Sequence, residues 1–164
     1  VHPSNPIQNL TLDQLQAVFA GQIINWSELG GRNAPIIAAG RDSASGTFET
    51  WQNLVMRGTD PAASILALAS NADVASEVVN NVNAMGYVGI AYISPMLKAV
   101  TVNGVEASLA TAVNYAYPIA RPLFMSTNGF PKPGAVLDTI LFILSDAGQR
   151  LVEEVGYAPI RVIE

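Results

Sequence analysis

One segment, Gly40 to Thr47 (GRDSASGT), combines a cation, small residues and hydroxyls in a pattern suited to an anion. Arg41 offers a planar guanidinium that matches the oxygens of a tetrahedral oxyanion. Ser45 is a favourable N-cap for a helix beginning at Gly46, and the first N–H groups of a helix have no partner within it. We expect the free amides of Gly46 and Thr47, the hydroxyls of Ser45 and Thr47 and the helix dipole to form an anion cradle. Candidate supporting residues are Asp42 and Ser43.

The same loop also has a purely structural interpretation. An ordinary connection between a strand and a helix would use Ser45 only as a cap. In that case Arg41 would pair with Asp42 or Glu49. The residue types in the loop do not by themselves decide between this interpretation and an anion cradle.

Two catalytic motifs built on glycine and serine do not fit the loop. A phosphate-binding P-loop places a lysine after its last glycine, where this chain has Thr47. A nucleophile elbow places a glycine two residues before the serine, where this chain has Ser43. The single histidine, His2, is the one histidine base that a serine hydrolase could use. We therefore expect no catalytic residue and no enzymatic activity.

The composition argues against further classes of chemistry. The chain has no cysteine and one histidine, so we expect no metal site and no cofactor. The net charge is −5 and the chain has no basic run, which argues against a nucleic-acid partner. With 164 residues, 50% of them hydrophobic and 13% charged, the chain is typical of one folded domain.

Short-range signals predict the elements that must position the loop. Pro35 to Ala39 (PIIAA) is an apolar run typical of a buried strand, and it leads into the loop. A helix should follow the loop and end at Gly58. Strands and helices alternate along the chain, so the predicted fold class is α/β. The other predicted elements are helices at 11–21, 25–28, 61–70, 70–82, 108–114, 134–144 and 146–155, a strand over 86–93 buried on both faces, and a hairpin at Asn103 and Gly104.

Five stretches of the chain resemble, in the same order, the periplasmic phosphate-binding proteins of bacterial phosphate ABC transporters. They are NPIQNLTLDQLQAVFAGQIINWSELGG, PIIAAGRDSASGT, AMGYVGIAYI, YPIARPLFMST and ILSDAGQRLVEEVGYAPI, and the likeness runs essentially from end to end. The most specific parts are the Leu-Thr…Gln-Leu…Phe…Gly…Asn-Trp block and the Arg-x-x-x-Ser-Gly-Thr loop. The positions that the resemblance implies for phosphate contact, in the second lobe, are Arg41, Ser45, Gly46 and Thr47.

The resemblance also implies an architecture. Members of that family fold into two α/β lobes joined by crossover strands, with the anion in the cleft between them. This chain would be the second lobe of such a clamshell, a single structural unit with a mixed sheet flanked by helices, and the N-terminal lobe would be missing from it. The expected parts are a hinge connector at 1–6, the lobe core at 7–116, a returning crossover at 117–127 and C-terminal helices at 128–164.

The function implied by the resemblance is transport. The whole protein would bind inorganic phosphate in the periplasm, or otherwise outside the cytoplasm, and deliver it to an ABC permease. The family often writes the loop as Arg-Glu-Ser-Gly-Ser-Gly-Thr-Arg, and this chain differs at Asp42, Ala44 and Phe48. Asp42 keeps the carboxylate, whereas Ala44 removes a glycine and Phe48 removes a second cation. Because of these differences, the affinity or the choice of anion could differ from that of the family.

One alternative to transport stays open at this point. The chain could be a single lobe that senses an anion or binds a protein, and it could self-associate through apolar surface along 1–6 and 117–164. Arg121 could be a residue of the cleft or a charge on its rim. Four aromatic residues could line a ligand cleft, but such residues are more often part of the core of an α/β lobe. They are Trp26, Trp51, Tyr87 and Tyr92.

Overall fold

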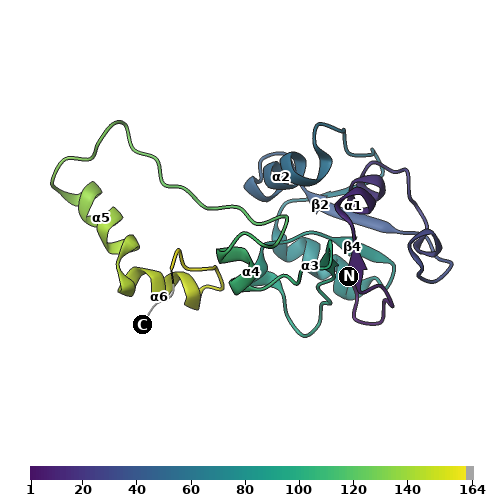
Figure 1. The fold of residues 1–164 in the computed structure, drawn as a ribbon. Helices are drawn as coiled ribbons and strands as arrows, with labels where there is room; N and C mark the ends of the chain where they lie inside the picture. The colour runs from purple at the N-terminus through teal and green to yellow at the C-terminus, as the bar shows by residue number, and fades with distance from the viewer. Residues whose placement is uncertain (162–164) are drawn as a thin grey trace.

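The strands of this protein gather in one body, and a long extended segment leads from it to a pair of helices (Figure 1). The chain after the second of these helices returns to the body, where Gly156 lies close against Ala91. The structure is a computed structural model that describes residues 1–161. The last three residues of the predicted C-terminal segment 128–164 lie outside this range. Within the described range, no helix has the length and apolar character needed to cross a membrane.

Three short parallel strands carry the loop. β2 (Ile37–Arg41) lies in the middle, between β3 (Leu66–Leu68) and β4 (Ala84–Gly86). Because the strands are parallel, their carboxyl ends lie at one edge of the sheet, where ligands of α/β proteins bind. A separate two-stranded parallel sheet pairs β1 (Asn9–Leu10) with β5 (Thr101–Val102).

The α/β class predicted from the alternation of elements is confirmed. Within the described residues every named strand pairs in parallel. The antiparallel pairing expected of a mixed sheet is limited to two isolated bridges, Asn25 with Pro35 and Val102 with Val105. The second bridge closes the predicted hairpin turn, in which Asn103 and Gly104 have φ of 50° and 80°.

One face of the three-stranded sheet is covered by α3 (Asn71–Asn80), which packs against β2 and β4. The buried Val74 and Val78 point from this helix toward the sheet. A Cβ on Gly86 would lie 2.6 Å from Val74 Cγ1, so the helix comes closer than a side chain at this position would allow. Successive strand residues point to opposite faces, which sends Ala38 and Met85 to the other side of the sheet.

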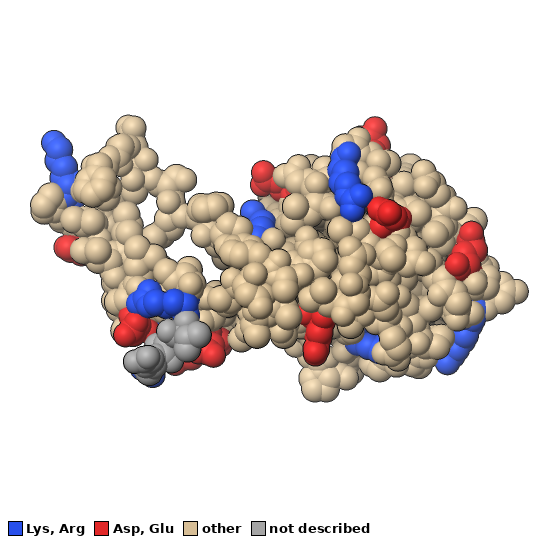
Figure 2. Space-filling view, viewed as in Figure 1, with Lys and Arg blue, Asp and Glu red and all other residues tan. Residues whose placement is uncertain are grey.

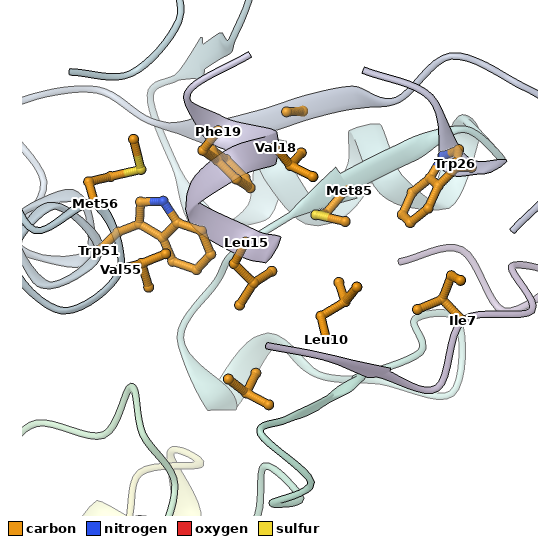
Figure 3. Packing of buried hydrophobic residues seen from close by; sticks show 12 residues of the cluster. Ile7, Leu10, Leu15, Val18, Phe19, Trp26, Trp51, Val55, Met56 and Met85 are labelled. Atoms are coloured by element: carbon orange, nitrogen blue, oxygen red, sulfur yellow. The ribbon is translucent and has the colours of Figure 1, made fainter. Parts of the chain in front are cut away.

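The main core lies on that other side. There α1 (Leu12–Phe19) packs against η2 (Gln52–Met56), a π-helical segment that continues α2 (Gly46–Trp51) without a break. Figure 3 shows Phe19 of α1 facing Trp51 of α2, and their ring centroids are 4.7 Å apart. The buried members of this cluster are Ile7, Leu10, Leu15, Val18, Phe19, Trp26, Ala38, Trp51, Val55, Met56, Met85 and Val102.

Side-chain caps begin most of the helices, and the sequence signals for them are confirmed. The helices predicted at 11–21 and 25–28 are α1 and η1 (Trp26–Leu29), and each begins with a capping box, formed by Thr11 with Gln14 and by Asn25 with Glu28. The predicted short helix is α4 (Leu109–Val113). The serine N-caps of α2, α3, α4 and α6 (Asp146–Glu154) are Ser45, Ser70, Ser108 and Ser145.

Two predicted elements are wrong. Residues 61–70 do not form a helix: the segment turns and then forms β3, because Leu66 to Leu68 pair with β2. The strand predicted over 86–93 is instead β4, which ends at Gly86, followed by the single turn η3 (Ile90–Tyr92). Tyr92 and Ile93 are 40% and 41% exposed, so the end of this apolar run is not buried.

Residues 117–127, hereafter the crossover segment, leave the body without forming a helix or strand. Tyr117 and Ile119 still pack against the core cluster, whereas every residue from Arg121 to Phe130 is exposed. Beyond it lie α5 (Ala135–Leu144) and α6, which pack against each other. The expected exposed apolar surface is thus present here, but not at residues 1–6, where Asn5 is buried and Val1 packs on the core.

Candidate anion-binding site

The candidate site begins where β2 ends and α2 starts. The buried Ser45 has extended backbone angles (φ −90°, ψ 129°) and is the N-cap of α2. Its Oγ accepts hydrogen bonds from the amides of Thr47 (3.1 Å) and Phe48 (3.4 Å). Because the oxygen accepts both of these bonds, the hydroxyl proton stays available to donate to a bound anion.

The prediction that the amides of both Gly46 and Thr47 are free is half wrong. An N-cap side chain accepts from the second and third amides of its helix, and here the second belongs to Thr47. Gly46 is the first residue of α2, and no described residue accepts its N–H. The backbone donor of the site is therefore Gly46, and Thr47 offers its hydroxyl.

The guanidinium of Arg41 turns along the edge of the sheet toward β3. Nε donates to the carbonyl of Leu68 at 3.2 Å and Nη2 to that of Ala69 at 2.8 Å. Neither of the two ion pairs among the described residues involves Arg41, so the predicted structural pairing with Asp42 or Glu49 is wrong. Arg41 is held by neutral carbonyls and keeps its positive charge uncompensated at the carboxyl edge of the sheet.

Tyr87, which follows β4, holds the start of the loop. Its hydroxyl oxygen accepts a hydrogen bond of 3.0 Å from the backbone N–H of Arg41. Its ring stacks on Trp51 of α2, with centroids 4.2 Å apart and 8° between the planes. A Cβ on Gly40 would lie 2.9 Å from this ring, so glycine is required there. Burial raises the pKa of Tyr87, against the smaller opposing effects of the Arg41 hydrogen bond and charge, so the hydroxyl is neutral near pH 7.

Arg121 brings a second cation to the loop. A Cβ built on Gly46 would lie 2.7 Å from Nη2 of Arg121, so the guanidinium packs against the Cα of this glycine on the side where other residues carry a side chain. Sequence reasoning left the position of Arg121 open between cleft and rim. Its contact with Gly46 joins segments far apart in the chain, and no local signal could have revealed it.

The two candidate supporting residues lie in the turn before the cap. The Asp42 amide donates to the Leu68 carbonyl (3.1 Å), and the Asp42 carbonyl accepts from the Ser45 amide (3.2 Å). The exposed Ser43 lines a depression of about 260 Å³ that also reaches Ser45 and Gly46. Neither Arg41 nor Thr47 lines it, so the structure brings only part of the predicted set around one hollow.

Charges of both signs lie near this site: Arg121 contacts Gly46, and Glu49 lines the same hollow as Ser45 and Gly46. Figure 2 shows the basic and acidic side chains scattered over the visible face, without an extended patch of one sign. Within residues 1–161, no group of three or more His, Cys, Asp or Glu side chains is placed to hold a metal ion. An anion here would be held by a few local donors and not by a broad electrostatic field.

The aromatic residues divide between core and surface. Trp26 and Trp51 are buried in the core cluster, and Tyr87 packs against it while also bonding the loop. Tyr92 is 40% exposed on η3. The core interpretation is therefore confirmed for both tryptophans, whereas Tyr87 has a second role that the sequence analysis missed.

The three-stranded sheet is parallel, and the loop at its carboxyl edge contains Arg41 and ends at the N-cap Ser45. This arrangement is typical of a ligand-binding α/β lobe. The particular family is set by comparison with known proteins. The chain belongs to the PBP superfamily, because the pattern of the PBP superfamily domain matches residues 1–147.

Several curated relatives share about three residues in ten with the chain. The phosphate-binding protein PstS of Borreliella burgdorferi is 29% identical over 97% of this chain and 61% of its own length. PstS of Bacillus subtilis is 28% identical over 98% of this chain and 53% of its own length. The chain thus spans only about half to three fifths of these relatives.

Solved structures of phosphate transport proteins superimpose well on this chain. One from Clostridium perfringens, described as a phosphate ABC transporter substrate-binding protein with bound phosphate, has a TM-score of 0.86 and 32% identity, covering 98% of this chain and 67% of its own. The structure of an ABC-type phosphate transport receptor of Vibrio cholerae has a TM-score of 0.82 and 28% identity, and the match covers 96% of this chain and 66% of that receptor chain. The predicted resemblance to phosphate-binding proteins is confirmed, and these relatives are named as binding proteins of transporters and not as enzymes.

Proposed function

We propose that the protein to which this chain belongs binds inorganic phosphate as the solute-binding component of an ABC-type phosphate uptake system. It would do so in the periplasm or another extracytoplasmic space and pass the anion to an ABC permease. No bond is made or broken in this function, so the chain acts as a binding lobe and not as an enzyme. The names of the relatives support phosphate over other tetrahedral anions as the ligand. They do not favour the alternative of a single-lobe sensor that takes no part in transport.

The arrangement at Gly46 is the observation that carries this proposal. A main-chain donor without an acceptor among the described residues lies beside the hydroxyl of Ser45 and the guanidinium of Arg121. Arg41 adds a second uncompensated charge at the end of β2. Donors of this kind suit an oxyanion. We assign phosphate contact to Arg41, Ser45, Gly46 and Thr47, with Asp42 and Ser43 shaping the turn.

The division of the chain that we propose follows from the same function. Residues 1–6 would form a hinge connector and 7–116 the core of the second lobe. Residues 117–127 would return to a first lobe, which the C-terminal helices at 128–164 would contact. The exposure of the whole stretch from Arg121 to Phe130 supports such a cover. It includes Phe124 and Phe130, which are 83% and 93% exposed.

Calorimetric titration of the full-length protein with phosphate tests this function. Wild-type protein should bind phosphate, and Arg41→Ala should bind about tenfold or more weakly, because a hydrogen bond to a charged group contributes about 1.5 to 3 kcal/mol. Arg32→Ala is the matched control, since the Arg32 side chain donates to the Ser4 carbonyl. Equal affinity in wild type and Arg41→Ala would contradict the assignment.

A further inference from the structure

We propose that Arg121 is a second arginine ligand of the anion, contributed by the crossover segment, so that a bound anion ties this segment to the loop. The inference rests on the proposed function and deepens it, because it assigns a ligand outside the Arg41-to-Thr47 loop. It also gives the crossover segment a direct part in sensing whether the site is occupied.

The position of Arg121 is the first support. Its Nη2 lies 2.7 Å from the position that a Cβ of residue 46 would take, so a side chain there would push the guanidinium away from the backbone. Gly46 is also the first residue of α2, and its amide donates to no acceptor among the described residues. An oxyanion that accepts from the Gly46 amide therefore lies within reach of the Arg121 guanidinium.

The electrostatics of Arg121 is the second support. The ion pairs among the described residues join Arg57 to Asp13 and Arg161 to Asp146, and neither involves Arg121. No hydrogen bond within the described range holds its guanidinium either. An arginine that rests on the loop without pairing to a described carboxylate is available to a tetrahedral oxyanion. The loop itself has Phe48 where the family often has an arginine, and Arg121 supplies a cation beside it.

The place of Arg121 in the chain is the third support. Ile119 still packs on the core cluster, and Arg121 begins the exposed stretch. A ligand that holds Arg121 against the loop would therefore also hold the start of the exposed segment, where the chain leaves the body (Figure 1). An anion bound by Gly46 and Arg121 together would restrain the direction of the crossover segment.

Phosphate titration calorimetry on the full-length protein tests the proposal, with wild type, Arg121→Gln, Arg121→Lys and Lys132→Gln. Lys132→Gln removes the same charge from the exposed chain beyond the crossover segment. We expect Arg121→Gln to weaken phosphate binding about tenfold, Arg121→Lys to weaken it less because the charge remains, and Lys132→Gln to leave it unchanged. Phosphate should also slow amide hydrogen exchange at 117–127 in wild type more than in Arg121→Gln at saturating phosphate.

The other outcomes separate this inference from the function on which it rests. Wild-type affinity in Arg121→Gln, with Arg41→Ala impaired, would overturn the role of Arg121 and leave the phosphate function standing. Equal losses in Arg121→Gln and Lys132→Gln would overturn a specific contact in favour of a general charge effect. A wild-type protein that binds no phosphate would overturn both the function and this inference.

Discussion

The backbone N–H of Arg41 donates a hydrogen bond of 3.0 Å to the hydroxyl oxygen of Tyr87, which joins the end of β2 to the residue after β4. This bond fixes the start of the loop from outside the loop. The Tyr87 ring is itself held by stacking on Trp51 of α2. The hydrogen bond and the stacked pair therefore tie the start of the loop to α2, the helix that follows the loop.

Tyr87→Phe removes the hydroxyl and keeps the stacked ring. The Arg41 amide then loses its acceptor, so we expect the free energy of unfolding to fall by about 1 to 3 kcal/mol and the phosphate affinity to fall a few-fold. Denaturant unfolding and calorimetry measure the two effects. Tyr92→Phe is the control because Tyr92 is exposed on η3. If both variants behave alike, the hydrogen bond does not support the site.

Ser45→Ala removes both the helix cap and a proposed phosphate donor. We expect unfolding to become easier by about 1 kcal/mol, which is typical of a lost N-cap, and phosphate binding to weaken. Ser108→Ala is the matched control, since Ser108 caps α4 with its Oγ on the Thr111 amide. It should cost similar stability and leave phosphate affinity unchanged. Equal affinities for the two variants would remove Ser45 from the site.

The sequence predicted the local parts of this structure and missed the parts made by contacts distant in the chain. The caps at Thr11, Asn25 and Ser45 depend on residues within three positions, so their signals lie within one short window. The strand at Leu66–Leu68 depends on its pairing with β2, and a short apolar run alone does not distinguish helix from strand.

The same difference separates the two arginines of the candidate site. Arg41 stands in the loop motif and could be found by its spacing to Ser45 and Gly46. Arg121 reaches the loop only because the crossover segment passes Gly46, which depends on the fold of the whole body. Tyr87 was missed as a loop support for the same reason, although its place in an apolar run predicted burial.

Gly46→Ala separates stability from binding at one position. Gly46 has no positive φ, and a Cβ there would meet only the end of the flexible Arg121 side chain, so the variant should unfold no more easily than wild type. The new methyl group would lie 2.7 Å from Nη2 of Arg121 and must displace it, so phosphate should bind more weakly. Calorimetry on Gly46→Ala, Arg121→Gln and the double variant measures the coupling. Fully additive losses would contradict a shared contact.

The isolated 164-residue chain should bind phosphate more weakly than the full-length protein. Closure of the first lobe over the site excludes water and adds donors. The loss of even two charge-assisted hydrogen bonds of about 1.5 kcal/mol each corresponds to about a hundredfold loss of affinity. Parallel calorimetric titrations of the two proteins measure the ratio. Submicromolar affinity in the isolated chain would contradict the proposal that it is one half of a clamshell.

The most direct test of the central claim is a phosphate titration of the isotope-labelled chain, followed in its amide nitrogen–proton correlation spectrum. Weak binding suffices for this measurement, and chloride at equal ionic strength is the control. We predict that the largest saturable shifts occur at the Gly46 amide and at the Arg121 side-chain N–H. Saturable shifts elsewhere with an unmoved Gly46 amide would contradict the phosphate site described here.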